Sequence, residues 1–443
     1  MKVEGKRILV VGLGRSGQAA VRFLCSRNAI VTAIDKKPSG QSDELSETLS
    51  KLGADVYWGN HPMQLFTAQD LIVPSPGVPW NLPELQEARI KGVSVAGELE
   101  IASDYLSGRV LGVTGTNGKT TTTALIGHIL KVAGQKVAVG GNIGRPVLSM
   151  IESATAEMWN VLELSSFQLE ATTSFRSDIG VVLNITPDHL DRHGTFESYR
   201  KAKYRIVANQ TSEDVLIVNR DDEICRGFAD SAHSRVTWFS RTLCLNEGVC
   251  SRNGLIFCDG VRVTEDQLPI RGKHNLENAL AAVAACRRIG IKLPQIAKGL
   301  QSFRPVEHRL EFVRKCNGIE YYNDSKATNV DAAVKSIESF DGRVWVILGG
   351  KDKDSDYLPL RAALNSKTQV GLLIGASAQK IKEQLGNSVE VRDLETLEKA
   401  VIYAHKNAQP GDTVLLAPAC ASFDQFASYE ERGTCFKNLV AML

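Results

Sequence analysis

Residues 114–120, Thr-Gly-Thr-Asn-Gly-Lys-Thr, place a lysine and a hydroxyl group at the end of a glycine-containing loop. The loop follows an apolar run, and the segment behind it has apolar residues at helical spacing. Backbone amides of such a loop cradle phosphates, the lysine reaches the terminal phosphates, and the hydroxyl can bind Mg²⁺. Val113 stands where the general motif has its first glycine, which indicates a subclass of phosphate loop. The predicted phosphate-binding residues are Gly115, Thr116, Asn117, Gly118, Lys119 and Thr120.

A carboxylate and an imidazole are expected beside this loop. Glu163 ends one predicted strand, and Asp188 and His189 follow another. Because parallel strands end at one edge of a sheet, these side chains should share the edge that carries the phosphate loop. Mg²⁺ combines few protein ligands with phosphate oxygens. The alternative is that Asp188 caps a helix and His189 bonds only locally. The predicted metal ligands are Thr120, Glu163 and His189.

A second glycine-rich loop, Gly-Leu-Gly-Arg-Ser-Gly at residues 12–17, directly follows a short apolar run near the start of the chain. Asp35 follows 18 residues past its end. Glycines at this spacing let backbone amides approach a diphosphate at a helix N-terminus. A nicotinamide cofactor, another nucleotide and a tight turn without a ligand are all compatible with this pattern.

These residues need a framework of strands that alternate with helices, and the sequence shows three blocks of that pattern. We predict an α/β protein with a Rossmann-like N-terminal domain at residues 1–96, a P-loop-type central ATPase domain at 97–305 and a Rossmann-like C-terminal domain at 306–443. A hinge is expected at residues 302–307, around Pro305. The expected strands lie at residues 8–11, 31–34, 70–73, 110–113, 159–164, 180–183, 344–348, 370–374 and 413–416, with a helix at 276–289.

Bulk composition excludes several classes of protein. Lys and Arg total 52 against 50 acidic residues in a chain of 443, so no strongly basic nucleic-acid-binding surface is expected. No apolar run is long enough to span a membrane, and the first residues do not form a signal peptide. The nine cysteines lack a C-x-x-C pair, which favours a reduced, cytoplasmic protein. The loose group Cys244, Cys250 and Cys258 falls in a predicted hairpin and is a weak zinc candidate.

Several blocks in order resemble the Mur ligases of peptidoglycan synthesis, over nearly the whole chain. The phosphate loop resembles the family's ATP loop, which folylpolyglutamate synthases share. Other matching blocks are Gly-Gly-Asn-Ile-Gly at 140–144, Glu-Leu-Ser-Ser-Phe-Gln-Leu at 163–169, Asp-His-Leu-Asp-Arg at 188–192, His-Asn at 274–275 with Asn278, His-Arg at 308–309, and Asn-Asp-Ser-Lys-Ala-Thr-Asn at 323–329.

Within the family, residues 418–426 and the first domain resemble the D-glutamate-adding branch, whereas the alanine-adding branch usually has His where Asn117 stands. The resemblance implies UDP and not NAD in the first domain. It also implies an acyl-phosphate mechanism that joins D-glutamate to UDP-N-acetylmuramoyl-L-alanine, in a cytoplasmic protein expected to be a monomer. The implied residues for the UDP-linked substrate are Gly14, Arg15, Ser16, Asp35, Lys36, Ser75, Gly77, Asn142, Ser165 and Gln168.

The same resemblance assigns the remaining groups. ATP would be used with two Mg²⁺ ions, and Lys203 would be carbamylated by CO₂ and bind metal; by itself this lysine reads as part of a solvated basic run. The implied catalytic residues are Lys119, Lys203 and His189, and the implied adenosine-binding residues are Asn275, Asn278, Arg309 and Asp324.

Amino-acid selection is predicted in the third domain, because glutamate presents two carboxylates that need donors. Ser422 is expected to start a helix, whose free amides favour an anion, and Thr328 precedes the expected helix cap Asn329. Lys351 is an alternative to Lys353, and simple capping is an alternative for both hydroxyls. The predicted amino-acid-binding residues are Thr328, Lys353, Ser422 and Phe423.

Three readings compete. A nicotinamide-dependent oxidoreductase explains the first loop but neither the second loop nor the acidic edge. A non-catalytic nucleotide sensor would tolerate loss of the metal-binding residues, yet all are present. Another Mur ligase, or a folylpolyglutamate synthase-like amide ligase, is the alternative within the enzymes.

Overall fold

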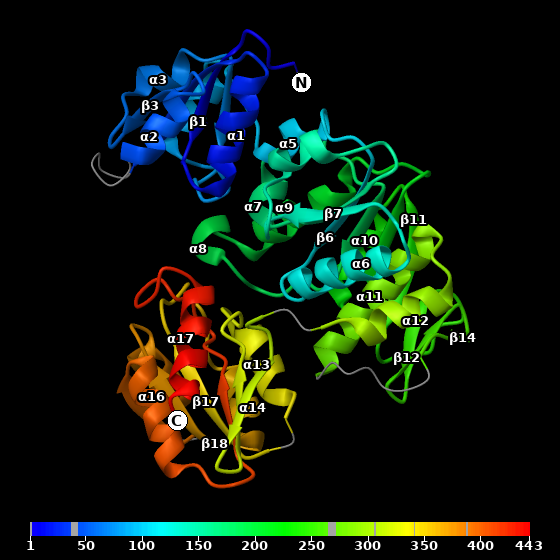
Figure 1. Ribbon diagram of the computed structural model, residues 1–443, viewed down its shortest axis with the longest axis vertical. Helices are drawn as coiled ribbons and strands as arrows, with labels where there is room; N and C mark the ends of the chain where they lie inside the picture. Colours follow the sequence, from blue (N-terminus) through cyan, green and yellow to red (C-terminus); the bar gives the residue numbers. More distant parts are fainter. Residues whose placement is uncertain (1, 37–42, 265–271, 305–306, 341, 387–388) are drawn as a thin grey trace.

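The computed structural model describes residues 2–36, 43–264, 272–304, 307–340, 342–386 and 389–443. Three separate sheets, each with helices packed on it, follow one another along the chain (Figure 1). Most neighbouring strands are parallel, as strand–helix alternation predicts. The expected α/β class and the three-domain architecture are confirmed. Pro305 and Val306, at the centre of the expected hinge, lie outside the described residues.

The first sheet has five parallel strands in the order β3-β2-β1-β4-β5. The apolar strand β1 lies at its centre, so the loop that follows β1 opens at the middle of the carboxyl edge. Its elements are β1 (Arg7–Val11), α1 (Arg15–Ser26), β2 (Ile30–Asp35), α2 (Asp43–Ser50), β3 (Asp55–Trp58), α3 (Met63–Thr67), β4 (Leu71–Pro74), α4 (Pro83–Ile90) and β5 (Ser94–Val95).

The second sheet has nine strands in the order β14-β13-β12-β11-β10-β9-β6-β8-β7. Strand β6 lies between β8 and β9, which places the phosphate loop beside the ends of both. The first ten elements after β5 are α5 (Glu98–Ser103), β6 (Arg109–Thr114), α6 (Lys119–Val132), β7 (Val137–Gly141), the 3₁₀ helix η1 (Val147–Ser153), β8 (Trp159–Glu163), α7 (Ser166–Glu170), β9 (Ile179–Val182), α8 (Leu190–His193) and α9 (Phe196–Ala208).

The far side of this sheet ends in antiparallel strands. Cys250 and Cys258 lie on the expected hairpin, and the described residues hold no cluster of three or more metal-type side chains, so the zinc alternative gains no support. The remaining elements are β10 (Val215–Asn219), α10 (Glu223–Asp230), β11 (Arg235–Ser240), β12 (Val249–Arg252), β13 (Leu255–Cys258), β14 (Val261–Arg262), α11 (Lys273–Ile289) and α12 (Leu293–Ser302).

The third sheet has six strands in the order β15-β16-β20-β17-β18-β19, with only β15 antiparallel to its neighbour. Apolar clusters cover both of its faces. Its elements are β15 (Glu311–Cys316), β16 (Ile319–Asn323), α13 (Val330–Glu338), β17 (Val344–Gly349), α14 (Leu360–Lys367), β18 (Thr368–Ile374), α15 (Ala378–Leu385), β19 (Val391–Glu395), α16 (Leu397–Asn407), β20 (Thr413–Leu416) and α17 (Tyr429–Ala441).

One expectation about this domain is wrong: no helix starts at Ser422. The last helix begins at Tyr429 and is capped by Ser428. The intervening residues form a bend because their side chains bond to neighbouring loops. Asp424 accepts from the backbone of Ala376, and Gln425 donates to the backbone of Glu395.

The first and second domains share one continuous apolar core, in which η1 packs against α1 and α5. Among the described residues, no helix is long and apolar enough to cross a membrane.

Gly17 is predicted to be essential for the fold of the first loop. A Cβ atom at this position would overlap the carbonyl oxygen of Gly12, whereas a Cβ at Gly14 would meet nothing within 4 Å. Gly17→Ala should therefore lower the first unfolding midpoint by roughly 3 °C or more, since overpacking costs about 1–3 kcal/mol. Calorimetry of the full chain measures this shift, with Gly14→Ala as the matched control. Equal midpoints for the two variants would contradict the prediction.

Candidate active site

The phosphate loop connects the central strand β6 to helix α6. Gly118 takes a left-handed conformation, φ +85°, at the start of the helix. Lys119 turns back over the loop, and its Nζ donates to the carbonyls of Gly115 at 3.0 Å and Thr116 at 2.7 Å. Burial lowers the pKa of Lys119, while the nearby Glu163 carboxylate opposes that shift. The loop thus holds a cation at the helix N-terminus, an arrangement that suits phosphate.

Residues that follow β9 hold this loop in shape. Asn184 makes two hydrogen bonds with the backbone of Asn117, accepting at 2.8 Å and donating at 3.1 Å. The hydroxyl of Thr116 donates to the Thr186 carbonyl at 3.0 Å and lies 3.0 Å from the Tyr199 hydroxyl. These contacts come from two separate segments, the residues after β9 and helix α9. The conformation of the loop therefore depends on the folded middle domain.

A carboxylate with a vacant bonding position faces the same space. Oε1 of Glu163 accepts from the side chain of Asn142 at 2.8 Å. Its other oxygen, Oε2, is buried and has no hydrogen-bond partner within the described ranges. A buried carboxylate oxygen without a partner is costly unless a cation or donor completes it. Together with the hydroxyl of Thr120 on the same cavity wall, it fits the hard oxygen donors that Mg²⁺ prefers.

His189 lies at the edge of this cavity in a left-handed conformation, φ 52°. Burial lowers its pKa to about 3 against the opposing effect of the Asp188 carboxylate, so its imidazole is neutral at pH 7 and can bind a metal. Asp188 does not act as the cap of α8. It accepts a hydrogen bond from Asn329 at 3.0 Å and lies 3.5 Å from Nζ of Lys353, both in the third domain.

Lys203 projects inward from α9 and is only 1% exposed. Its Nζ donates to the carbonyl of Gly115 at 2.7 Å and lies 4.7 Å from the centre of the Tyr199 ring. Burial lowers its pKa well below the usual value, and the charge of Lys119 lowers it further. The sequence reading of Lys203 as part of a solvated face is therefore wrong, because its side chain points into the domain.

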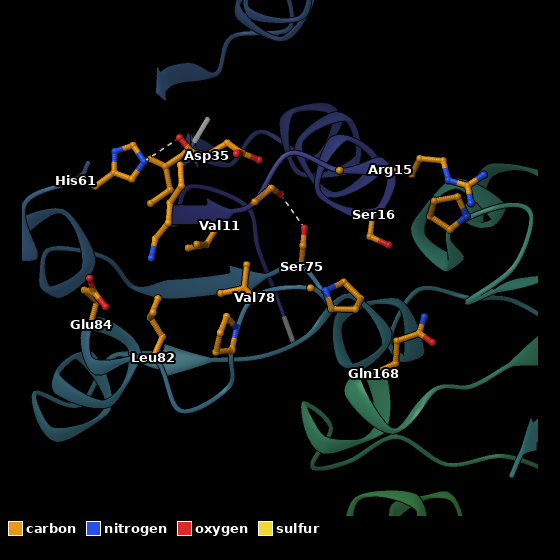
Figure 2. Close-up of a pocket in the computed structure, with 18 of the residues that line it drawn as sticks. Val11, Arg15, Ser16, Asp35, His61, Ser75, Val78, Leu82, Glu84 and Gln168 are labelled. Atoms are coloured by element: carbon orange, nitrogen blue, oxygen red, sulfur yellow. Dashed lines mark hydrogen bonds between the residues drawn. The ribbon is translucent and has the colours of Figure 1, made fainter. Parts of the chain in front are cut away.

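A cavity of about 740 Å³ lies at the carboxyl edge of the first sheet and reaches the middle domain. Figure 2 shows Arg15 and Ser16 near one end, Asp35 and His61 near the other, and Gln168 on the side of the middle domain. Nine of the ten residues predicted for the UDP-linked substrate line this cavity, and Ser165, which caps α7, does not. The nine are Gly14, Arg15, Ser16, Asp35, Lys36, Ser75, Gly77, Asn142 and Gln168.

A second cavity, of about 380 Å³, surrounds the phosphate loop. Six of the ten residues predicted for ATP line it: Thr116, Asn117, Gly118, Lys119, Thr120 and Arg309. Gly115 does not line this cavity.

Three predicted ATP residues are buried near this cavity but are not part of its wall. Asn278 abuts Gly118 and donates to Asn275 at 3.2 Å, and Asp324 lies 3.7 Å from Arg309. The structure therefore brings the phosphate-binding set together more completely than the adenosine-binding set.

A third cavity, of about 360 Å³, lies between the middle and third domains. All four predicted amino-acid-binding residues line it, opposite Ser165, His189 and Lys203 of the middle domain. Lys351, the alternative to Lys353, instead pairs through its backbone with Ala421. The four residues are Thr328, Lys353, Ser422 and Phe423.

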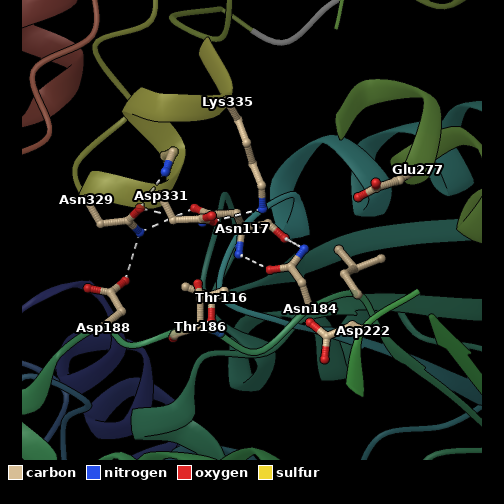
Figure 3. A network of polar contacts seen from close by, with 12 residues as sticks. Thr116, Asn117, Asn184, Thr186, Asp188, Asp222, Glu277, Asn329, Asp331 and Lys335 are labelled. Atoms are coloured by element: carbon tan, nitrogen blue, oxygen red, sulfur yellow. Dashed lines mark hydrogen bonds and ion pairs between the residues drawn. The ribbon is translucent and has the colours of Figure 1, made fainter. Parts of the chain in front are cut away.

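Polar contacts tie the phosphate loop to the third domain (Figure 3). The side chain of Asn117 donates to Asp331 at 2.5 Å, and Lys335 donates to the same carboxylate at 2.8 Å. Asn329 caps α13 and contacts both Asn117 and Asp188. The second and third cavities are therefore each lined by residues of both the middle and the third domain.

Comparison with known proteins decides the family. The "Mur ligase MurD-like, N-terminal domain" model matches residues 6–97, the "Mur ligase middle domain" model matches 113–286, and the "Mur ligase, glutamate ligase domain" model matches 308–420. The UDP-N-acetylmuramoylalanine–D-glutamate ligase of Solibacter usitatus is 51% identical over 442 residues, covering 99% of this chain and 98% of its own. The chain belongs to the Mur ligase family.

A second Mur ligase with the same name, from Acidobacterium capsulatum, is 49% identical over 450 residues, covering 99% of this chain and 97% of its own. Among solved structures, UDP-N-acetylmuramate–alanine ligase from Thermotoga maritima superposes with a TM-score of 0.64 at 21% identity, covering 99% of both chains. MurF from Acinetobacter baumannii gives 0.61 at 18% identity, covering 100% of this chain and 91% of its own. At these identities the solved structures show a common fold.

Sequence reasoning missed the residues that support the phosphate loop of this Mur ligase. Asn184 lies two residues past the end of β9, so it could have been predicted at the sheet edge on the same grounds as Asp188. Tyr199 and Asp331 carried no local signal, because each reaches the loop from a distant segment.

Asn184→Ala is predicted to weaken ATP binding because it removes both side-chain hydrogen bonds to the backbone of Asn117. Loss of two hydrogen bonds corresponds to a rise of about five- to fiftyfold in the dissociation constant. Titration calorimetry with ATP measures it. The matched control is Asn209→Ala, which also removes two side-chain hydrogen bonds to the backbone, at the carbonyls of Thr173 and Phe175 outside the loop. Similar affinities for both variants would argue against a role for Asn184 in shaping the loop.

Proposed function

We propose that this Mur ligase joins D-glutamate to the alanine carboxylate of UDP-N-acetylmuramoyl-L-alanine in peptidoglycan synthesis. As a member of the family it is an ATP-dependent, amide-bond-forming ligase. The observation that carries the proposal is the third cavity, in which cationic and hydroxyl donors from the third domain face Lys203 and His189 of the middle domain. Relatives at 51% and 49% identity over nearly the whole chain carry the name of this reaction.

The first cavity would hold the UDP portion of the acceptor. Arg15 and Ser16 lie at the N-terminus of α1, where backbone amides and a guanidinium favour a diphosphate. The apolar part near Asp35 would take the base, as Val11 and Ile34 line the same cavity. Asn142 lines all three cavities, which supports an acceptor that runs from the first domain to the phosphate loop.

The acceptor carboxylate must approach the γ-phosphate of ATP, and both groups are anionic. Like charges about 4 Å apart repel by several kcal/mol at the effective dielectric near a protein surface. Lys119 would offset this repulsion and hold the terminal phosphates, while Arg309 would contact the nucleotide from the third domain. The carboxylate oxygen then attacks phosphorus and ADP leaves, so that the carboxylate gains a phosphate leaving group.

Mg²⁺ is expected with ATP, held by Thr120, Glu163 and His189, as the partnerless oxygen of Glu163 supports. When bound, the metal would neutralise phosphate charge. Two ions would need a further anionic ligand, and we propose a carbamate on Lys203 for this role. The amine nitrogen forms a C–N bond with CO₂ and releases one proton, a reaction that needs the uncharged amine. The lowered pKa of Lys203 favours that form.

D-glutamate would bind in the third cavity, with its amine toward the acyl phosphate and its carboxylates on the third domain. Lys353 supplies a cation, and Thr328, Ser422 and the backbone of Phe423 supply donors. Attack by the neutral amine forms the amide bond and releases phosphate and a proton. Contact between the two domains would exclude water from the acyl phosphate. We place the reaction in the cytoplasm, since all nine cysteines are described and unpaired.

The decisive experiment is phosphate release from ATP, with UDP-N-acetylmuramoyl-L-alanine and a panel of amino acids that includes D-glutamate, L-glutamate, L-alanine and L-lysine. Release that requires both the uridine substrate and D-glutamate supports the proposal. Release with a different amino acid would show that this amino acid, and not D-glutamate, is the one added. Release with folate-type acceptors would favour a folylpolyglutamate synthase-like ligase. Calorimetry with UDP and NAD tests the first cavity separately, where NAD binding with no UDP signal would reject the assignment.

Lys203→Ala is predicted to lose nearly all ligation because the carbamate would be absent. Short-chain carboxylic acids should restore part of the activity, as they can occupy the space of the missing group and bind metal. Activity with and without added acetate or propionate measures this effect. Lys201→Ala, on the exposed face of the same helix, is the control. A Lys203→Ala enzyme with almost full activity would show that no carbamate is needed.

Lys353→Ala and Ser422→Ala are predicted to raise the Michaelis constant for D-glutamate about ten- to a hundredfold, since a charge-assisted contact is worth roughly 1.5–3 kcal/mol. The constants for ATP and the uridine substrate should change little. Steady-state kinetics with each substrate varied in turn measures the difference. Lys351→Ala is the matched control, because its side chain does not line the cavity. If glutamate dependence is unchanged in both variants, the amino-acid site lies elsewhere.

A further inference from the structure

Arg432, on the first turn of α17, is only 1% exposed, and no carboxylate forms an ion pair with it among the described residues. Burial lowers its pKa to about 10, which leaves it charged at pH 7. A buried guanidinium without a counter-ion is costly unless its N–H groups are satisfied. The surrounding loops must therefore supply acceptors for these N–H groups.

The guanidinium joins two loops of the third domain through four hydrogen bonds. Its Nε and Nη2 donate to the hydroxyl and carbonyl of Ser325, at 3.0 and 2.9 Å. Nη2 also donates to the carbonyl of Cys420 at 3.2 Å, and Nη1 to that of Ala421 at 3.3 Å. A planar fork with fixed N–H directions can hold such a set, whereas a lysine ammonium cannot reproduce its geometry.

A third loop is attached through Ala421. Its carbonyl also accepts from the backbone of Lys351 at 2.9 Å, and its N–H donates back to the Lys351 carbonyl at 3.1 Å. Each of the three attached loops leads within a few residues to one side chain of the third cavity. Ser325 precedes Thr328, Lys351 precedes Lys353, and Ala421 precedes Ser422.

The geometry also orients the backbone at Ser422. In a trans peptide the C=O and N–H groups point in opposite directions. Because the Ala421 carbonyl faces Arg432, the N–H of Ser422 points away from the guanidinium. Within the described part of the chain, neither this N–H nor the Ser422 hydroxyl donates to a protein group, although Ser422 is buried and lines the cavity. Both donors therefore remain available to an anion.

We infer that Arg432 is a positioning residue for amino-acid selection. It holds two loops directly and a third through Ala421, so that their donors converge on a carboxylate of the incoming amino acid. Its buried charge adds positive potential behind the same donors. The inference rests on the proposed amino-acid site but concerns a residue that does not itself line the cavity. Arg432 touches no phosphate-loop residue, so its effect should be selective for one substrate.

The test compares Arg432→Met and Arg432→Lys with wild-type enzyme in the phosphate-release assay. In Arg432→Met the Michaelis constant for D-glutamate should rise about tenfold or more, because the loops at Ser325 and at Cys420–Ala421 lose their shared donor. The constants for ATP and the uridine substrate should stay within about twofold. Arg432→Lys, which keeps the charge but not the fork, should lie between. The control is Arg392→Met, an exposed arginine of the same domain that pairs with Glu390.

A uniform loss of turnover, or an equal rise in all three constants, would mark Arg432 as only structural and overturn the inference, as would an unchanged glutamate constant. Thermal unfolding of each variant is recorded alongside. If Arg432→Met does not fold, Ser325→Ala, which removes one acceptor and keeps the guanidinium, is judged by the same criteria. If wild-type enzyme selects a different amino acid, the comparison is made with that amino acid, so this inference and the proposed function fail separately.

Discussion

Two lysine amines, Lys119 and Lys203, donate to the same carbonyl oxygen, that of Gly115, at 3.0 and 2.7 Å. Two ammonium groups this close cannot both stay charged without a large electrostatic cost, and burial adds to it. The one on α9 is the more buried, and its pKa is the one lowered well below the usual value. This shift favours loss of a proton from Lys203, which lies beside Lys119 at the end of β6. The neighbouring carboxylates of Glu163 and Asp188 oppose the lowering of both lysine pKa values.

The cost of placing two lysine amines together explains why residues distant in the sequence support the phosphate loop. Positive groups can be concentrated only where the backbone supplies carbonyls for them, and the loop exposes those of Gly115 and Thr116. Keeping these carbonyls turned inward takes support from Asn184, Thr186 and Tyr199. A reaction between two anions needs such charge in place before the substrates arrive, because reorganisation would cost free energy during the step.

The third domain also contains a buried cation, which is stabilised in a different way. Its buried cation, Arg432, has no carboxylate partner in the described residues and is stabilised by backbone carbonyls and one hydroxyl. In both domains a buried cation donates to backbone carbonyl groups and so fixes the loops that carry them. The contacts of Asn117 with Asp331 and of Asp188 with Asn329 then bring the two charged regions together.

The sequence by itself determined the α/β class, the three-domain order and the phosphate loop, because apolar runs and glycine loops are local patterns. It also placed Glu163 and His189 correctly at one edge, since parallel strands end together. Most of the predicted site residues line three cavities. The role of Lys203 came from the family resemblance, whereas the amino-acid site came from the donors that two carboxylates need, and both remain proposals. Only the tertiary structure decided that Lys203 points inward, that the segment after Ser422 bends, and that Arg432 joins two loops of the third domain. These features depend on contacts between distant residues, such as Lys203 with Gly115, 88 positions apart, and Arg432 with Ser325, 107 positions apart, which no local pattern encodes.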